Sequence, residues 1–259
     1  MYQELKSEIL SLLSKNTRLD GRKSDEYRPI FIETGVSRNA EGSARVKIGD
    51  TEVMAGVKLE VMKPYPDAPD KGSLMVNVEL YPISSPEFES GPPSMDAIEY
   101  ARVTDRCIRE SKMIDVEALC IEKGEKAWML VIDVVTLNEG GNLFDAVPLA
   151  ALAALKNAVF PEYDGSNIDY KHKTDKKLPI SMWPVSVTVY KYGNHLVIDP
   201  TYEEERVYDA RLTVGVYDDK TLCSLQKGGD NAVSDEELLS MISLAIAKHK
   251  ELKKALDSI

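Results

Sequence analysis

The feature of this sequence that most constrains its fold is a Gly-Gly turn, Gly140-Gly141, between a strand-like run and a helix-like run. Residues 128–137 are almost continuously apolar and predict a strand, whereas residues 145–159 are rich in alanine and predict a helix. Such a turn is a natural anion site, because free backbone N–H groups and the positive end of the helix point at one spot. The alternative is a plain helix N-terminus capped by Asp145.

The residues that follow the two glycines lack the charge of a phosphate site. A phosphate-using enzyme would place a hydroxyl and an arginine there, whereas this chain has Asn142 and Leu143. We therefore expect the loop to have the backbone shape of a phosphate site but not the positive charge that binds phosphate. This combination indicates a non-catalytic relative of a phosphate-using enzyme.

Composition narrows the class of protein. The chain has 259 residues, of which 43% are hydrophobic and 29% charged, as in a soluble globular protein. No apolar run reaches the roughly 20 residues that span a bilayer, and the N-terminus lacks the apolar region of a signal peptide. Three cysteines without a CxxC pair are typical of a reducing compartment. We therefore expect a cytoplasmic protein without membrane contact.

Charge and histidine spacing limit the ligands of the chain. The net charge of −11 argues against nonspecific binding of nucleic acid over the whole surface. Any local patch of positive charge would therefore be a significant feature. The three histidines lie far apart in sequence and show no metal-ligand spacing. We therefore expect no metal site in this chain.

Strands and helices alternate in groups rather than one by one, which predicts an α+β fold. Strands are expected at 44–48, 51–57, 73–81, 125–137, 185–190, 195–198, 211–217 and 221–226, and helices at 2–14, about 96–112, 145–159 and from 234 onward. Gly49-Asp50 predicts a hairpin turn, and residues 161–179 predict a polar, basic loop.

Because no change of composition marks a boundary, we expect a single domain over 1–259, with an N-terminal helix and turn-rich link over 1–22 and a C-terminal helix over 234–259.

The helix expected near residue 96 carries three arginines on one face. Arg102, Arg106 and Arg109 stand at i, i+4 and i+7. A second, apolar face, turned well away from the arginines, is expected to pack on the sheet; it comprises Ala97, Ile98, Ala101 and Ile108. Aligned guanidiniums need anions nearby, and their planar forks suit phosphate. Two interpretations stay open: a phosphate-binding face, or a stripe of intrahelical salt bridges, which stabilise a helix little.

An acidic segment, 199–209, follows the strand expected at 195–198. Its carboxylates could bind Mg²⁺ or act as a general acid. However, the middle of the segment, Glu203, Glu204 and Glu205, contains none of the shorter aspartates that a metal site would prefer. A solvated acidic turn is therefore the favoured interpretation.

Taken together, these stretches resemble the RNase PH family of 3′→5′ phosphorolytic exoribonucleases. Residues 18–22, Arg-Leu-Asp-Gly-Arg, look like a motif of that family, and 41–44 followed by 49–51 look like its first hairpin. Within the family, the chain is most similar to the non-catalytic ring subunit of the archaeal exosome, over stretches 20–23, 76–80, 91–93, 101–106 and 140–146. The resemblance implies an RNase PH-like fold, related to the ribosomal protein S5 domain 2-like β-α fold, with mixed sheets packed with helices.

Departures from the family pattern carry the functional expectation. Where catalytic members have Gly-Thr-Arg or Gly-Ser-Arg, this chain has Gly141, Asn142 and Leu143, and the family's acidic Asp is replaced by glutamates in 203–205. The resemblance thus implies a degenerate phosphate loop over 140–143, no catalytic residue and no enzyme activity of the chain by itself. The arginines are retained: Arg102 and Arg106 match family arginines that hold RNA phosphates, and Arg109 matches less closely.

The resemblance also implies partners. This chain would alternate with a catalytic RNase PH-like subunit in a trimer of heterodimers, and RNA would enter through a cap of S1-domain proteins. Mg²⁺ and inorganic phosphate would serve the partner's active site and not this chain. Two alternatives stay open: a phosphorolytic exoribonuclease in its own right, using Glu203–Glu205, and a ring scaffold without RNA contacts.

Overall fold

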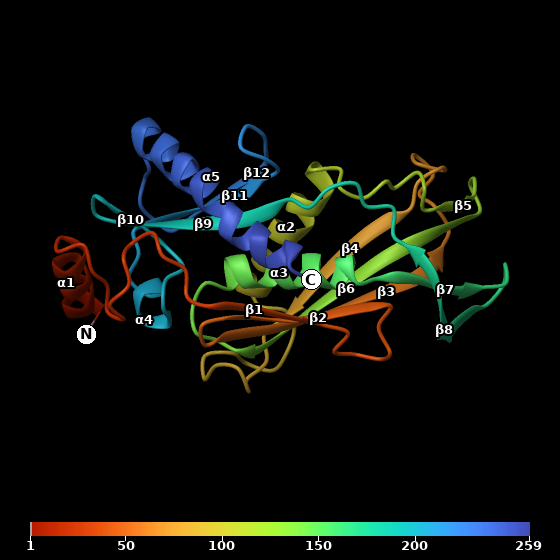
Figure 1. Ribbon diagram of the computed structural model, residues 1–259, viewed down its shortest axis with the longest axis horizontal. Coiled ribbons are helices and arrows are strands. Elements are labelled where there is room, and N and C mark those ends of the chain that lie inside the picture. Colours follow the sequence, from red (N-terminus) through yellow and green to blue (C-terminus); the bar gives the residue numbers. More distant parts are fainter. Residues whose placement is uncertain (1) are drawn as a thin grey trace.

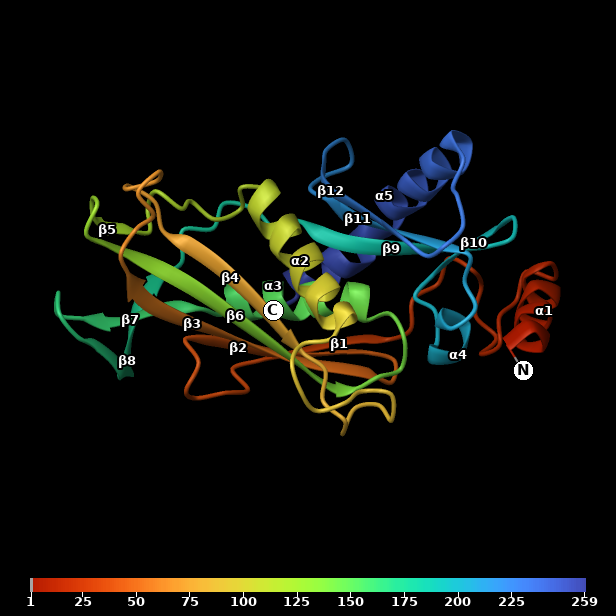
Figure 2. The same cartoon turned by 180° about the vertical axis from the view of Figure 1, so that it is seen from behind.

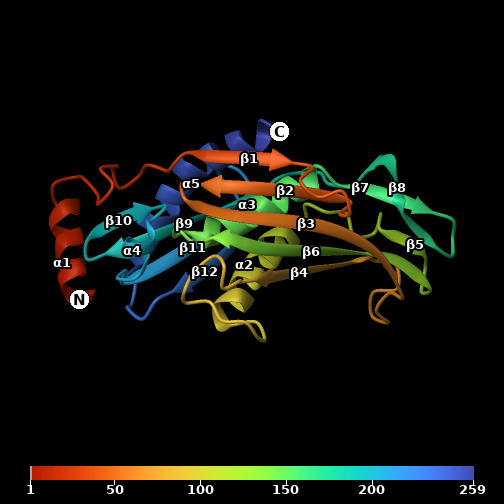
Figure 3. The same cartoon turned by 90° about the horizontal axis from the view of Figure 1, so that it is seen from below.

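The computed structural model describes residues 2–259 and arranges five helices and three sheets along one long axis (Figure 1). The first sheet has the strand order β1-β2-β3-β6-β4, with β5 paired to β6 (Figure 3). Its strands are β1 (Ile30–Thr34), β2 (Gly42–Ile48), β3 (Thr51–Met62), β4 (Ser73–Glu79), β5 (Cys120–Glu122) and β6 (Lys126–Asn138). All neighbours are antiparallel except β4 and β6, which run parallel and are joined through a helix, as parallel strands require.

The second sheet has four antiparallel strands in the order β10-β9-β11-β12. They are β9 (Val185–Tyr192), β10 (His195–Ile198), β11 (Ala210–Val216) and β12 (Leu222–Gly228). A separate hairpin of β7 (Val159–Tyr163) and β8 (Ile168–Lys177) lies at one end of the molecule, and helix α1 (Tyr2–Leu13) lies at the other (Figure 1).

Helix α3 (Leu143–Lys156) holds the two larger sheets together. Every residue from 143 to 155 is buried, as expected for a helix that is apolar all round. α3 contacts β2 and β3 of the first sheet and β9 of the second (Figure 2). The side chains of α3 therefore join one continuous apolar cluster that reaches from Val46 in β2 to Val187 in β9.

Two further long helices cover the sheets. Helix α2 (Met95–Glu110) packs on β4, α3 and β12, and helix α5 (Asp235–Asp257) packs on β9 and β11. A four-residue helix, α4 (Tyr202–Glu205), follows β10. Both α4 and α5 begin with a capping box, at Thr201 and Ser234 respectively. None of the helices within residues 2–259 is both long enough and apolar enough to cross a bilayer.

The structure confirms the α+β class and most of the expected elements. Gly49-Asp50 forms the hairpin between β2 and β3, because Ile48 pairs with Thr51. Two expectations were wrong. The stretch expected as a loop over 161–179 contains most of the β7–β8 hairpin; its strand β8 is exposed along nearly its whole length, so it lacks the apolar alternation that marks a half-buried strand. α3 spans Leu143–Lys156 rather than 145–159.

The division of the chain into domains stays a prediction. The first residue of the expected 1–22 segment lies outside the described residues, and α1 accounts for Tyr2–Leu13 of that segment. The C-terminal helix predicted over 234–259 is α5, with Ser234 as its N-cap.

Candidate functional site

The Gly-Gly turn forms the N-terminus of α3, with Asn142 as the N-cap residue. Asn142 has φ 62° and Gly141 has φ 92°, both in the left-handed region. A Cβ on Gly141 would lie 2.5 Å from the carbonyl oxygen of Pro200 and 2.8 Å from the backbone nitrogen of Tyr202. The loop is therefore pressed against the segment that leads into α4, and a side chain at position 141 would separate them.

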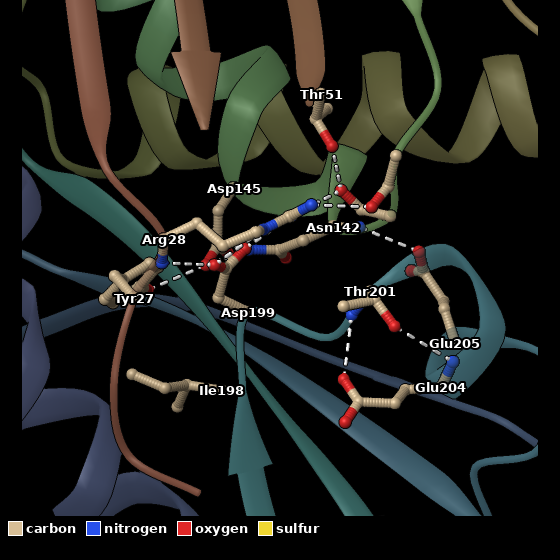
Figure 4. Close-up of polar contacts among 12 residues, drawn as sticks. Tyr27, Arg28, Thr51, Asn142, Asp145, Ile198, Asp199, Thr201, Glu204 and Glu205 are labelled. Carbon is tan, nitrogen blue, oxygen red and sulfur yellow. Dashed lines mark hydrogen bonds and ion pairs between the residues drawn. The ribbon is translucent and has the colours of Figure 1, made fainter. Parts of the chain in front are cut away.

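The chain's own carboxylates occupy the backbone amides of this loop. The Gly141 N–H donates to Oε1 of Glu139 at 2.9 Å. The Asn142 N–H donates to Oε2 of Glu205 at 2.8 Å (Figure 4). The Tyr190 hydroxyl donates to the other oxygen of Glu205 at 2.5 Å. Two of the donors that could cradle an external anion are thus already bound to internal ones.

Asp145 does not cap the helix, so the plain-cap interpretation was wrong. Asp145 lies within the first turn of α3, fully buried, and accepts hydrogen bonds from the Tyr27 hydroxyl at 2.7 Å and from Nδ2 of Asn142 at 3.0 Å (Figure 4). Burial raises the pKa of Asp145 to about 7. The N-cap side chain, Asn142, instead ties Asp145 to a second buried aspartate.

That second aspartate, Asp199, follows β10 and anchors the loop through arginines. Nδ2 of Asn142 donates to Asp199 at 3.0 Å, and Arg28 donates through Nε and Nη2 at 2.9 and 2.7 Å. Although burial alone would raise the pKa of Asp199, the hydrogen bonds and charge of Arg28 hold it below its usual value. Arg22 also reaches Asp199, at 3.0 Å.

Arg28 fixes the loop directly as well. Its Nη1 donates to the carbonyl of Gly140 at 2.6 Å, and its Nη2 to that of Gly141 at 3.0 Å. The arginine can lie this close because position 49 is a glycine; a Cβ there would meet the Arg28 Cδ at 2.4 Å. The sequence did not point to Arg28, for which the nearest signal was the pair of arginines in the motif at 18–22. Asp199 was expected only as the first residue of the acidic segment 199–209, and its role in anchoring the loop was not.

The expectation of a solvated acidic turn over 199–209 was also wrong. Of the three consecutive glutamates only Glu203 is exposed. Glu204 is 1% exposed and pairs with the buried guanidinium of Arg18, whose Nε donates to Oε1 at 3.0 Å. These carboxylates are held by structural partners, as buried charges must be.

The three predicted arginines of α2 line one groove between α2 and β4. The groove has a volume of about 320 Å³ and is also lined by Leu74, Met75, Val76, Ala101, Asp105 and Glu110. The face that the helical spacing predicted is therefore present. Whether it binds RNA stays a prediction.

The partners of the three arginines differ. Arg109 is in a salt bridge with Asp105, at 2.7 Å, and Arg106 donates to Oε1 of Gln226 on β12 at 3.0 Å. Arg102 is exposed, and its side chain has no hydrogen bond or ion pair with any of residues 2–259. Arg102 is thus the most available of the three for an external phosphate.

The apolar face of α2 differs in part from the expected one. Ile98 is 47% exposed, because it lies one helical turn before Arg102 on the same side, and Ala101 lines the arginine groove. The helix is buried through Ala97, Val103, Thr104, Cys107 and Ile108.

A second hollow, of about 450 Å³, lies beside the phosphate loop. Glu139, Glu205 and Asp96 line it together with Arg206 and Arg211. The Arg211 guanidinium stacks on the ring of Phe144, 3.6 Å from its centre, and pairs with Glu99 at 2.7 Å. An inorganic phosphate that approached the loop from this side would find the amides of Gly141 and Asn142 already hydrogen-bonded to Glu139 and Glu205.

Glu139 makes the free energy of unfolding of the chain depend on pH. Burial raises the pKa of Glu139 to about 7, from 4.5, and the charge of Glu205 adds to the shift. The folded chain therefore keeps this proton over a pH range in which the unfolded chain has lost it. Its contribution to stability is complete below pH 4.5 and is lost as the pH rises through about 7.

We expect the variant Glu139→Gln to lose this pH dependence. Between about pH 5 and about pH 8, the free energy of unfolding of the wild type should fall by on the order of 1–3 kcal/mol more than that of the variant. Urea denaturation across this range measures the difference. Glu203→Gln, at an exposed glutamate of the same segment, should follow the wild type, and a Glu139→Gln profile parallel to the wild type would refute the assignment.

Possible metal ligands gather away from the loop. Glu162, Asp169 and His172 of the β7–β8 hairpin have ligand atoms within 4.8 Å of one another, and all three are exposed. Nδ1 of His172 is already hydrogen-bonded to Asp169 at 2.8 Å. The expectation that this chain has no metal site stays a prediction.

Comparison with known proteins identifies the family. The model of the 3′ exoribonuclease family, domain 1, matches residues 26–161, and that of domain 2 matches residues 183–248. The chain belongs to the RNase PH family of 3′ exoribonucleases.

Its curated relatives include two archaeal proteins named exosome complex component Rrp42. That of Methanothermobacter thermautotrophicus is 42% identical over 96% of this chain and 93% of the relative, and that of Methanocella arvoryzae is 45% identical over 97% and 95%. Among solved structures, the Archaeoglobus fulgidus exosome with RNA bound to the active site contains a chain with a TM-score of 0.90 and 41% identity, covering 98% of each chain. A chain of an archaeal exosome core has a TM-score of 0.86 and 37% identity, covering 99% of this chain and 97% of the other.

Proposed function

We propose that this chain is a non-catalytic subunit of an archaeal exosome ring. It supports 3′→5′ phosphorolytic RNA degradation by structuring the active site of a catalytic RNase PH-like partner and by helping to bind RNA. The observation that carries the first half of this proposal is the occupation of the loop amides by Glu139 and Glu205. A loop that binds its own carboxylates in this way is unsuited to inorganic phosphate.

The arginine groove supports the second half. Arg102 offers an unpaired guanidinium, and Arg106 can exchange its neutral partner, Gln226, for a phosphate oxygen. A charge-assisted hydrogen bond to phosphate is stronger than one to a neutral amide. Arg109 is the weakest of the three, because Asp105 already neutralises it.

The partners and location follow from the resemblance to the archaeal exosome proteins. The chain alternates with the catalytic subunit in a trimer of heterodimers, capped by S1-domain proteins and located in the cytoplasm. Mg²⁺ and inorganic phosphate act in the catalytic subunit and are not held by this chain.

A ring scaffold without RNA contacts is the second candidate. The salt bridge between Arg109 and Asp105 and the hydrogen bond from Arg106 to Gln226 favour it, since they occupy two of the three arginines within the chain. The unpaired Arg102 favours RNA binding.

The assembly is tested by native mass measurement. We expect the chain purified alone to form no closed ring, and the chain co-expressed with a catalytic RNase PH-like subunit to give a hexamer with equal numbers of the two proteins. A ring built from this chain alone that failed to take up the catalytic subunit would contradict the proposed role.

A further inference from the structure

Two cysteine thiols from distant parts of the chain meet between α2 and β12. The Sγ atoms of Cys107 and Cys223 lie 3.8 Å apart, although 116 positions separate the residues in sequence. α2 packs on β12 in this region (Figure 2). Because a disulfide bond is about 2.05 Å long, the two sulfurs must approach each other by less than about 2 Å to form one.

Local backbone structure directs Cys223 toward its partner. Gly215 pairs with Ser224 and Val216 pairs with Leu222, so Cys223 is the extra residue of a β-bulge between β11 and β12. A bulge re-aims a side chain out of the normal alternation of the strand.

A glycine makes room for both sulfurs. A Cβ on Gly215 would lie 2.8 Å from Sγ of Cys223 and 3.3 Å from Sγ of Cys107. The two thiols therefore share a space above β11 that a larger residue at position 215 would fill.

The two thiols differ in exposure and in pKa, so that one of them can react with an oxidant before the other. Cys107 is 1% exposed, and its hydrogen bond to Cys223, together with burial, raises its pKa well above the usual value. Cys223 is partly exposed, and its contact with the Cys107 thiol holds its pKa below the usual value. Cys223 is therefore the thiol that reacts first with an external oxidant, and Cys107 is placed to react second.

We propose that Cys107 and Cys223 form a reversible disulfide that locks α2 onto the second sheet, with a peroxide as the oxidant. The Cys223 thiolate attacks a peroxide oxygen, the O–O bond breaks, and the products are a sulfenic acid and hydroxide, which takes up a proton to become water. The Cys107 sulfur then attacks the sulfenic sulfur; an S–S bond forms, the S–O bond breaks, and a second water leaves with the Cys107 proton. The two thiols lose two electrons, which reduce the peroxide, and a thiol reductant reverses the reaction.

The lock would act on the helix that carries the arginine groove. Arg106 of α2 already donates to Gln226 of β12, so the disulfide would add a covalent link between the same two elements. The proposal rests on the packing of α2 and β12 and does not depend on the proposed function.

The test uses the full-length chain, alone and assembled with its catalytic partner, in a Cys120→Ser background that leaves only the two thiols. After treatment with hydrogen peroxide, we expect both thiols to disappear, a proteolytic fragment that links Cys107 to Cys223, a higher melting temperature, and full recovery with dithiothreitol. With Cys107→Ser added, Cys223 should stop at the sulfenic acid and react with dimedone. With Cys223→Ser added, Cys107 should stay reduced.

The proposal fails if no fragment linking Cys107 to Cys223 forms after peroxide treatment. It fails equally if Cys223 is oxidised beyond the sulfenic acid as fast with Cys107 present as without it. Should Cys107→Ser not fold, the Cys223→Ser variant decides instead. In that variant, oxidation of Cys107 at the wild-type rate would refute the assigned order of attack.

Discussion

Changing Arg102 and Arg106 together to glutamate is expected to lower the affinity of the assembled ring for RNA by one to several orders of magnitude. Each charge-assisted hydrogen bond to a phosphate contributes about 1.5–3 kcal/mol, and a glutamate at either position also repels the RNA backbone. Because arginine contacts to phosphate are independent of base sequence and release counterions, the loss should be similar for all RNA sequences, and the salt dependence of binding should flatten.

The fold of the double variant should be unaffected, since the residues that bury α2, among them Ala97, Val103 and Ile108, are unchanged. A matched control is Lys63→Glu with Lys123→Glu, which makes the same change in charge at two lysines that are 72% and 71% exposed and belong only to surface ion pairs. Fluorescence anisotropy with labelled RNA at several salt concentrations measures both. An assembled Arg102→Glu/Arg106→Glu ring that bound RNA as the wild type does would leave the chain as a scaffold only.

The resemblance to the family implies an arginine at position 143 in catalytic members. Leu143→Arg is expected to destabilise the chain by about 3–5 kcal/mol and to restore no phosphorolysis. Leu143 is 0% exposed and belongs to the main apolar cluster, so a guanidinium there would be buried without a partner. Even a tolerated arginine would leave Glu139 and Glu205 on the loop amides.

Leu143→Met is the control, because a swap that conserves side-chain volume costs under about 1.5 kcal/mol. Urea denaturation measures the stability of both variants, and release of nucleoside diphosphates measures phosphorolysis. If Leu143→Arg proved as stable as Leu143→Met, the argument from the burial of Leu143 would be wrong. If Leu143→Arg became active, the occupation of the loop amides by Glu139 and Glu205 would not prevent phosphorolysis.

The common face of the three arginines and the position of the loop could be predicted, because both depend on residues close together in the sequence. The spacing of Arg102, Arg106 and Arg109 fixes their common face in any α-helix, and a glycine pair between a strand and a helix fixes the turn. Ile98 was wrongly expected to be buried, because it was assigned to the buried face as an apolar residue and not by its angle about the helix axis.

The occupation of the loop could not be predicted, because it depends on contacts between residues far apart in the chain. Glu205 reaches the Asn142 amide across 63 positions, and Arg28 reaches Asp199 across 171. From the sequence alone, a run of three glutamates is most simply a solvated turn. Only the packing of α4 against the start of α3 turns Glu205 into an internal ligand of the loop.

Phosphorolysis is expected to require the active site of the catalytic partner, because this chain is expected to form no active site of its own. Release of nucleoside diphosphates from poly(A) in the presence of phosphate and Mg²⁺, first with this chain alone and then with the assembled ring, tests it most directly. We expect no release by the chain alone and phosphate-dependent release by the ring. Phosphate-dependent release by a preparation of this chain free of any partner would contradict the claim.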